Sequence, residues 1–245
     1  MEIVDAMRVI NEFSSLEDLR EGRIFLVDKK YGFTSFSAVN KLRWMIRHHA
    51  GIKKIKVGHA GTLDPLATGL LVICVGKMTK QIQHLIQEDK TYTGSFSLGQ
   101  ITPSFDLETE PSEMVDTAFV DEQLLHKTAQ DFLGEQDQYP PVFSAKKIDG
   151  KRAYEMARKG EEVELKSSRI RIDHFDITRF DNPEVEFEIA CSKGTYIRSI
   201  ANDFGQQLGC GAYLKSLRRT QSGAFNIDQA ESLQEIEQKL IEVFK

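Results

Sequence analysis

An aspartate in a glycine-rich loop is the residue of this sequence whose type and surroundings best suit chemistry. Residues 57–76 read VGHAGTLDPLATGLLVICVG, and His59 stands five residues before Asp64. Pro65 biases the backbone of Asp64 away from helix, and the glycines on both sides permit unusual backbone angles. A carboxylate held rigidly beside a buried strand suits a nucleophile or a general base. The alternative is an aspartate that bonds to nearby backbone in a turn.

A second candidate segment reads SKGTYIRSI and contains Tyr196 and Arg198. Here a predicted strand gives way to a helix. If Arg198 faced Asp64, a bidentate contact would keep that carboxylate ionised and lower its pKa by roughly 1–3 units. The spacing leaves open whether the two side chains meet. Tyr92, near the start of a predicted strand, is by residue type more often a core residue than a catalytic one.

Strands that cluster in runs, without strict alternation with helices, must position these residues. This order favours the α+β class with a mixed, mostly antiparallel sheet and flanking helices and loops. Ser35 or Ser37 is the expected N-cap of the first helix, and Ser232 with Glu235 forms the expected capping box of the last one. Apolar residues alternate with glutamates along 184–192, as in a half-buried strand. Expected helices are 35–49, 122–133, 153–160, 195–209 and 232–244; expected strands are 68–76, 91–99, 169–177 and 184–192; expected exposed loops are 103–122 and 135–153.

Composition limits the possible classes. The 245 residues are 40% hydrophobic and 28% charged, which fits a soluble globular protein. No apolar run approaches the roughly 18 residues of a membrane helix, and the acidic start MEIVDAMRVINEF is unlike a signal peptide, so we expect a cytoplasmic location. Cys74, Cys191 and Cys210 stand far apart, without metal-ligand spacing, so we expect buried thiols and no metal site.

The charge distribution leaves nucleic acid open despite a net charge of −5. Residues 41–56 hold six Lys or Arg and no acid, and residues 144–159 hold six basic and two acidic residues. The segment KSLRR at 215–219 adds three more basic residues. Segregated charge of this kind can form a basic groove for a polyanion, or simply ordinary solvated faces.

Five segments, which span about residues 25–225, carry a family resemblance. In chain order they are VDKKYGFTSFSAVNKLR, GHAGTLDPLATGLLVICVGKMTK, KTYTGSFSLG, QYPPVFSAKKIDGKRAYEMARKGEEVE and CSKGTYIRSIANDFGQQLGCGAYLKSLRRTQSGAF. In the same order they resemble the first motif, the signature segment, the strand with the active-site tyrosine, an RNA-contacting loop and the third motif of the TruB family of transfer RNA pseudouridine synthases.

The resemblance implies the pseudouridine synthase fold and a transfer RNA partner, bound through its T-arm. The implied reaction isomerises uridine 55 (RNA numbering) of the T-loop: the base is flipped out, its bond to ribose is cleaved, and it is rejoined through C5. No cofactor and no metal is implied. This agrees with a sequence that lacks a Walker loop, a dinucleotide fingerprint and a metal motif.

The resemblance also implies a role for each candidate residue. Asp64 becomes the catalytic aspartate, and Arg198 its expected partner. The other family positions are expected to bind or support the nucleotide: His59 fills space beside it, Tyr92 stacks on the uracil, Tyr196 and Leu217 line the pocket, and Lys29 gives structural support.

Two departures from the family motifs stand out, and a third departure is the C-terminal PUA domain, which we do not expect here. Lys29 is followed by Lys30 where the family usually has proline, and TPSFDLETE replaces a Thr-Asp-Thr pattern. We expect one catalytic domain over residues 1–245, with an N-terminal extension at 1–23, an RNA-contacting loop at 135–160 and no C-terminal PUA domain. We also expect a monomer. Two alternatives stay open: a guide-RNA-dependent synthase of the dyskerin type, and a protein that mainly helps transfer RNA to fold.

Overall fold

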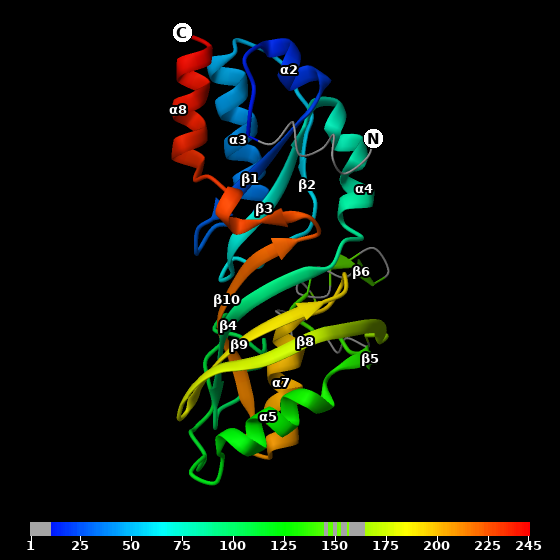
Figure 1. Cartoon of the computed structure of the whole chain (residues 1–245), viewed down its shortest axis with the longest axis vertical. Coiled ribbons are helices and arrows are strands. Elements are labelled where there is room, and N and C mark those ends of the chain that lie inside the picture. The colour runs from blue at the N-terminus through cyan, green and yellow to red at the C-terminus, as the bar shows by residue number, and fades with distance from the viewer. Residues whose placement is uncertain (1–10, 145–146, 149–150, 153–155, 157–164) are drawn as a thin grey trace. The chain divides into compact units, whose positions relative to one another are not determined.

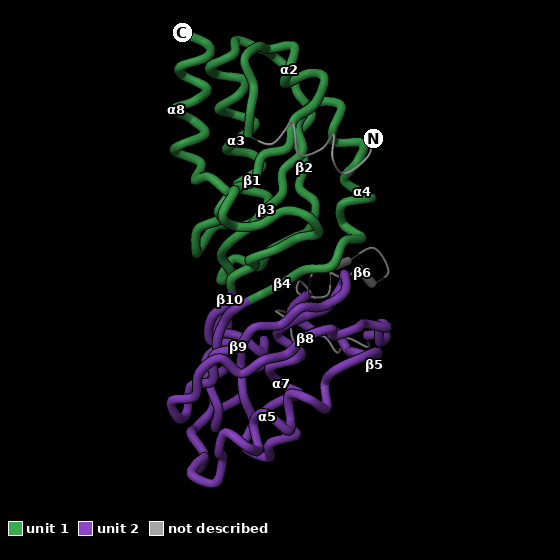
Figure 2. The backbone as a smooth tube through the Cα atoms, viewed as in Figure 1, with its two compact units in different colours: residues 1–92, 218–245 green, residues 93–217 purple. Residues whose placement is uncertain are grey.

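The computed structural model of the chain describes residues 11–144, 147–148, 151–152, 156 and 165–245. The chain forms two compact units (Figure 2): unit 1 holds residues 1–92 and 218–245, and unit 2 holds residues 93–217. Strands β4 (Lys90–Leu98) and β10 (Ala212–Ser222) each contribute residues to both units. The chain therefore passes between the units along two strands and not along a flexible linker.

Unit 1 is built around strand β3. This strand pairs antiparallel with β1 on one side, with Lys29 opposite Gly69, and antiparallel with β2. Its first residues pair in parallel with β10, where Arg219 lies opposite Gly69. Helices α3 and α8 pack against each other (Figure 1). The elements of unit 1 are α2 (Leu16–Glu21), β1 (Arg23–Lys29), α3 (Ser35–His49), β2 (Val57–His59), β3 (Thr68–Val75), η1 (Gly76–Gln81), α4 (Ile82–Leu85), β11 (Phe225–Asn226), η2 (Ile227–Gln229) and α8 (Leu233–Val243), with parts of β4 and β10.

Unit 2 contains the remaining strands, in the order β10-β4-β9-β8-β5. Strands β8 and β9 pair antiparallel with two register shifts, and β5 pairs antiparallel with β8. Helices α5 and α7 pack against each other, as Figure 1 shows. The elements of unit 2, besides its parts of β4 and β10, are α5 (Glu122–Asp131), β5 (Gly134–Gln138), β6 (Lys147–Ile148), β7 (Lys151–Arg152), β8 (Ser168–Asp181), β9 (Glu184–Cys191) and α7 (Ile197–Leu208).

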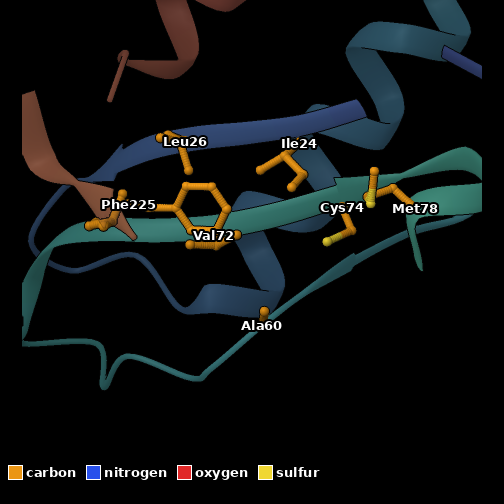
Figure 3. Packing of buried hydrophobic residues seen from close by; sticks show 8 residues of the cluster. Ile24, Leu26, Ala60, Val72, Cys74, Met78 and Phe225 are labelled. Carbon is orange, nitrogen blue, oxygen red and sulfur yellow. The ribbon is translucent and has the colours of Figure 1, made fainter. Parts of the chain in front are cut away.

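Each unit has its own apolar core. In unit 1, side chains of β1 and β3 meet Phe225, and Figure 3 shows Leu26, Val72 and Cys74 among them. In unit 2, five phenylalanines form a ring cluster in which the centroids of Phe96 and Phe187 lie 4.3 Å apart. Burial of such surface stabilises a fold by about 25 cal/mol per Å2. Each unit is therefore stabilised by a core of its own.

Most expected elements are confirmed, and so is the α+β class. The alternation along β9 buries Val185, Phe187, Ile189 and Cys191, as expected. The capping box of Ser232 and Glu235 is also present at α8. The three cysteines are buried thiols that form no disulfide, as expected, and burial raises the pKa of the Cys74 thiol to about 12.

Four expectations need correction or fall outside the described residues. Thr34, not Ser35 or Ser37, is the N-cap of α3, because its side chain accepts a hydrogen bond from the Ser37 amide. Residues 134–138 form β5 and do not begin a loop, since their backbone pairs with β8. The acidic loop at 103–122 is not wholly exposed: Ser104 and Asp106 are buried. The helix expected at 153–160 lies outside the described residues, except for residue 156.

Two searches concern the described part of the chain. None of its helices combines the length and the apolar content that crossing a membrane requires. Among the same residues, no three His, Cys, Asp or Glu side chains gather in a way that could hold a metal ion.

Candidate active site

The Asp64 loop joins β2 to β3 in unit 1 and is fixed by hydrogen bonds on both sides of the aspartate. The Asp64 carbonyl accepts a hydrogen bond from the Ala67 amide at 3.1 Å, which closes a turn. The Ser35 hydroxyl, at the start of α3, accepts from the Leu63 amide at 2.8 Å and donates to the Leu63 carbonyl at 3.0 Å. The half-buried Asp64 is thus held by backbone contacts made by its neighbours, as rigid placement of a reacting group requires.

Lys29 supports the same loop from the end of β1. Its side chain is 1% exposed, and its ammonium group donates to the carbonyls of Phe33 at 2.6 Å, Lys30 at 3.2 Å and Pro65 at 3.4 Å. Burial lowers the pKa of Lys29 to about 8, Asp64 opposes this shift, and Arg219 adds to it. These contacts with backbone carbonyls fit the supporting role expected for Lys29.

Arg219 is a site residue that the sequence analysis did not single out. Its side chain is 1% exposed, and its guanidinium donates to the Leu70 carbonyl at 2.8 Å and to the Gly61 carbonyl at 3.1 Å. It therefore joins the Asp64 loop to β3. The sequence showed it only as one residue of a basic segment, with nothing to separate it from Arg218.

Gly69 allows Arg219 to reach this position. Its φ is +96°, and an added Cβ would overlap the Arg219 backbone oxygen and lie 2.9 Å from the Arg219 nitrogen. A residue with a side chain would be strained at this φ and would push β10 away from β3. The glycine that follows Asp64 in sequence is therefore required by the close parallel contact of two strands.

His59 ends β2 as a half-buried, neutral imidazole. Burial lowers its pKa, and the charge of Arg219 lowers it further. Its buried Nδ1 atom has no hydrogen-bond partner among the described residues. A neutral ring beside the Asp64 loop fits the space-filling role expected for it. The structure thus brings Lys29, His59 and Asp64 together around Arg219 in unit 1.

The other expected site residues lie on strands and at a helix start. Tyr92 belongs to unit 1, on β4, and is 9% exposed. Tyr196 is the N-cap residue of α7 in unit 2, where its amide and its carbonyl both bond to the side chain of Gln138, at 2.8 and 3.1 Å. Leu217 is half-buried on β10. Their roles toward a nucleotide stay predictions.

Arg198 is buried in unit 2 near the start of α7. Its Nη1 donates to the carbonyls of Phe143 at 2.9 Å and Ser104 at 3.2 Å, and its Nε lies 3.5 Å from the carboxylate of Asp106. Asp106 comes from the acidic loop, which the sequence analysis placed on the surface. The expected pairing of Arg198 with Asp64 stays a prediction.

The three basic segments differ in the structure. In the segment 215–219, Lys215 pairs with Glu184 at 2.6 Å, Arg218 pairs with Asp28 through two contacts of 2.8 and 3.0 Å, and Arg219 is buried. This segment is therefore no free cationic patch. The segment 144–159 lies mostly outside the described residues. The segment 41–56 covers most of α3 and the loop that follows it.

Known proteins resemble most of this chain. Residues 47–197 match the model of the N-terminal domain of the TruB family pseudouridylate synthases, and residues 198–243 match the model of a tRNA pseudouridylate synthase B C-terminal domain. The chain therefore belongs to the TruB family of pseudouridylate synthases.

Individual relatives agree with this family. The chain is 50% identical to the tRNA pseudouridine synthase B of Flavobacterium johnsoniae, over 91% of this chain and 98% of that protein. It is 46% identical to the protein of the same name from Phocaeicola vulgatus, over 89% and 92% of the two chains. A solved structure of a Cbf5-Nop10-Gar1 complex contains a chain of the same fold, with a TM-score of 0.69 and 26% identity. The match covers 90% of this chain and 54% of the chain in that complex.

Proposed function

We propose that this protein converts uridine 55 in the T-loop of transfer RNA to pseudouridine, with Asp64 as the catalytic aspartate. The observation that carries the proposal is the geometry of the Asp64 loop. Its backbone is held by Ser35, Lys29 and Arg219, and Asp64 is a half-buried residue. The names of the relatives, which are 44–50% identical, support transfer RNA as the substrate.

The proposed reaction is an isomerisation and needs no oxidant or reductant. The bond between uracil N1 and ribose C1′ breaks, a bond between C5 and C1′ forms, C5 loses a proton and N1 gains one. An aspartate placed at the sugar can act as a nucleophile or assist the departure of the base. The base must first leave its stack in the folded loop, at a cost of a few kcal/mol. Tyr92, Tyr196, Leu217 and His59 are the side chains proposed to receive it, and Arg198 is the proposed partner of the Asp64 carboxylate.

The decisive experiment is pseudouridine mapping in an unmodified transfer RNA transcript incubated with the purified protein alone. The wild-type protein should modify a single T-loop uridine. Asp64→Asn should lower the rate at least about 10³-fold, because it removes the ionisable group and keeps its size. RNA binding by this variant should stay close to wild type. Turnover near the wild-type rate would exclude Asp64 as the catalytic group.

A matched control uses another loop carboxylate of unit 1. Asp89→Asn changes a carboxylate that lies just before β4, outside the Asp64 loop. Its rate should stay within about twofold of wild type, since surface substitutions away from a site usually have small effects. An equal loss in both variants would indicate a general dependence on charge and not a catalytic role of Asp64.

A guide-dependent synthase is the second candidate, favoured by the structural likeness to a chain of the Cbf5-Nop10-Gar1 complex. The same incubation separates the two candidates. Modification of bare transfer RNA without any other RNA or protein supports the first, and modification only after a guide RNA is added supports the second. Full rescue of a deletion strain by Asp64→Asn would instead support a main role in transfer RNA folding.

Four further expectations belong to this proposal. The protein is proposed to act in the cytoplasm. It is also proposed to be a monomer, and size-exclusion chromatography with light scattering tests the oligomeric state. The two compact units are proposed to work as one catalytic domain. Residues 135–160 are proposed to contact RNA, and deletion of 145–160 tests this through the affinity for a T-arm hairpin.

A further inference from the structure

Helix α3 of unit 1 exposes large aromatic side chains on one face. Phe36 is 66% exposed and Trp44 is 51% exposed, while the opposite face of the helix is buried in unit 1. Positions 36, 40, 44 and 48 follow one another at four-residue intervals, so they share a face. Leaving the rings of Phe36 and Trp44 in water costs free energy. Folding does not need these two rings, because the helix already has a complete buried face.

A cation and a second ring lie beside the exposed tryptophan. The ammonium group of Lys41 lies 4.6 Å from the centroid of the Trp44 ring, and the His48 ring stacks on Trp44 at 4.9 Å with an interplanar angle of 7°. Arg47 follows in the same turn, and α3 contains no acidic residue. Lys41 also forms an ion pair with Glu237 of α8, whose carboxylate lies 3.6 Å from the ammonium group. The face is therefore aromatic and mainly basic.

The same helix begins at the proposed active site. Ser35, its first residue, holds the backbone of Leu63 beside Asp64. At about 1.5 Å per residue, the 13 steps from residue 35 to residue 48 extend about 20 Å from that point. A nucleic acid whose reacting base lies at the Asp64 loop has its neighbouring nucleotides within this distance.

We propose that Phe36, Lys41, Trp44, Arg47 and His48, here named the α3 stripe, form a second RNA contact that stacks an unpaired or terminal base on Trp44. Aromatic rings between cations bind single-stranded nucleic acid, because bases stack on the rings and phosphates pair with the charges. RNA fits this surface better than a lipid bilayer does, since the exposed rings are few and separated by charge. The inference rests on the proposed function, but its test does not require turnover.

Trp44 supplies a direct signal because it is the only tryptophan of the sequence. An unmodified T-arm hairpin with single-stranded flanks is titrated into the Asp64→Asn variant, which binds the RNA without converting it. We expect saturable quenching of the tryptophan fluorescence, weakened as salt is raised from 50 to 200 mM. Saturated binding, measured by filter retention, with unchanged fluorescence would overturn the proposal.

Substitutions measure the contribution of the stacking. Trp44→Ala should weaken RNA binding about 5- to 150-fold, the range for loss of one stacked base, and Trp44→Phe should recover most of it. In the otherwise wild-type protein the loss should appear in KM and leave kcat unchanged. The matched control is Phe119→Ala, which removes a ring that is 54% exposed in unit 2. An affinity of Trp44→Ala equal to wild type, or a comparable loss in Phe119→Ala, would contradict the proposal.

Other outcomes are also decisive. Quenching by vesicles with 30% anionic lipid and none by RNA would assign the stripe to a membrane surface. If RNA quenches Trp44 and Trp44→Ala weakens RNA binding, but the wild-type protein forms no pseudouridine, the α3 stripe is supported and the proposed reaction is overturned. If the protein forms pseudouridine at a normal rate but RNA does not change the Trp44 fluorescence, the proposed reaction stands and the proposed RNA contact of the α3 stripe is contradicted.

Discussion

Two buried arginines, one in each unit, hold the segments around them in different ways. Arg219 of unit 1 donates to the carbonyls of Leu70 and Gly61, which are neutral acceptors. Arg198 of unit 2 also donates to carbonyls, but it faces the buried carboxylate of Asp106 at 3.5 Å as well. One positive charge is therefore balanced within its own unit by an acid, and the other is surrounded by dipoles.

The difference affects the titration of the neighbours. Arg219 lowers the pKa of both Lys29 and His59, in each case after the larger effect of burial. Its charge therefore disfavours additional positive charge at these two side chains.

The largest expected effect breaks the pair in unit 2. Arg198→Met should lower the free energy of unfolding by about 3–5 kcal/mol, because it leaves the buried Asp106 without the cation that faces it. Urea denaturation measures this value. The double variant Arg198→Met with Asp106→Asn should recover a large part of the loss, since both charges are then absent. If the free energy of unfolding does not recover in the double variant, the ion pair with Asp106 is not the source of the stability that Arg198 contributes.

A smaller loss is expected for the arginine of unit 1. Arg219→Met should lower the free energy of unfolding by about 2–4 kcal/mol, because two buried carbonyls lose their donor. Arg219→Lys should restore part of the stability. The contrast with Arg198 is that the guanidinium of Arg219 donates to the carbonyls of Leu70 and Gly61. The measurement is again urea denaturation, and a loss below about 1 kcal/mol would contradict the role assigned to Arg219.

The contact between β3 and β10 can be tested without changing any charge. Gly69→Ala should cost about 2–3 kcal/mol, because its Cβ meets the backbone of Arg219 in addition to the strain at positive φ. Gly134→Ala is the matched control, since Gly134 has a φ of +90° and no atom within 4 Å of an added Cβ. It should cost about 1 kcal/mol. Equal losses would mean that φ alone explains the need for glycine at position 69.

The smallest effect concerns pH. Because burial and Arg219 lower the pKa of His59 in the folded state, the unfolded chain binds its proton more readily. Stability should therefore be complete above about pH 6.5, the ordinary histidine value, and fall as the pH drops below it. His59→Gln should flatten this fall in thermal unfolding between pH 7.5 and 5. His126→Gln, at an exposed position of α5, should leave it as in wild type. Identical pH profiles for His59→Gln and wild type would contradict the interpretation.

Much of the fold followed from local patterns. The alternation along residues 184–191 and the helical spacing along 197–208 identified β9 and α7, because period 2 and period 3.6 come directly from backbone geometry. The glycines around Asp64 likewise marked a constrained loop. Residues 135–138 were predicted to begin a loop because adjacent prolines and a lone glycine follow them, and their pairing with β8 overrode that local pattern.

The sequence by itself indicated strands β3, β4, β8 and β9, the main helices, the loop that carries the proposed aspartate and the family that the chain resembles. It did not indicate strands β1, β2, β5 and β10. Only the tertiary structure decided which charges are buried. Neighbouring residues of a strand point to opposite faces, so one of Arg218 and Arg219 had to point inward, but the register with β3 selects which one. The contacts that bury Arg219 and Arg198 join residues 149 and 94 positions apart, and no local pattern encodes such a distance.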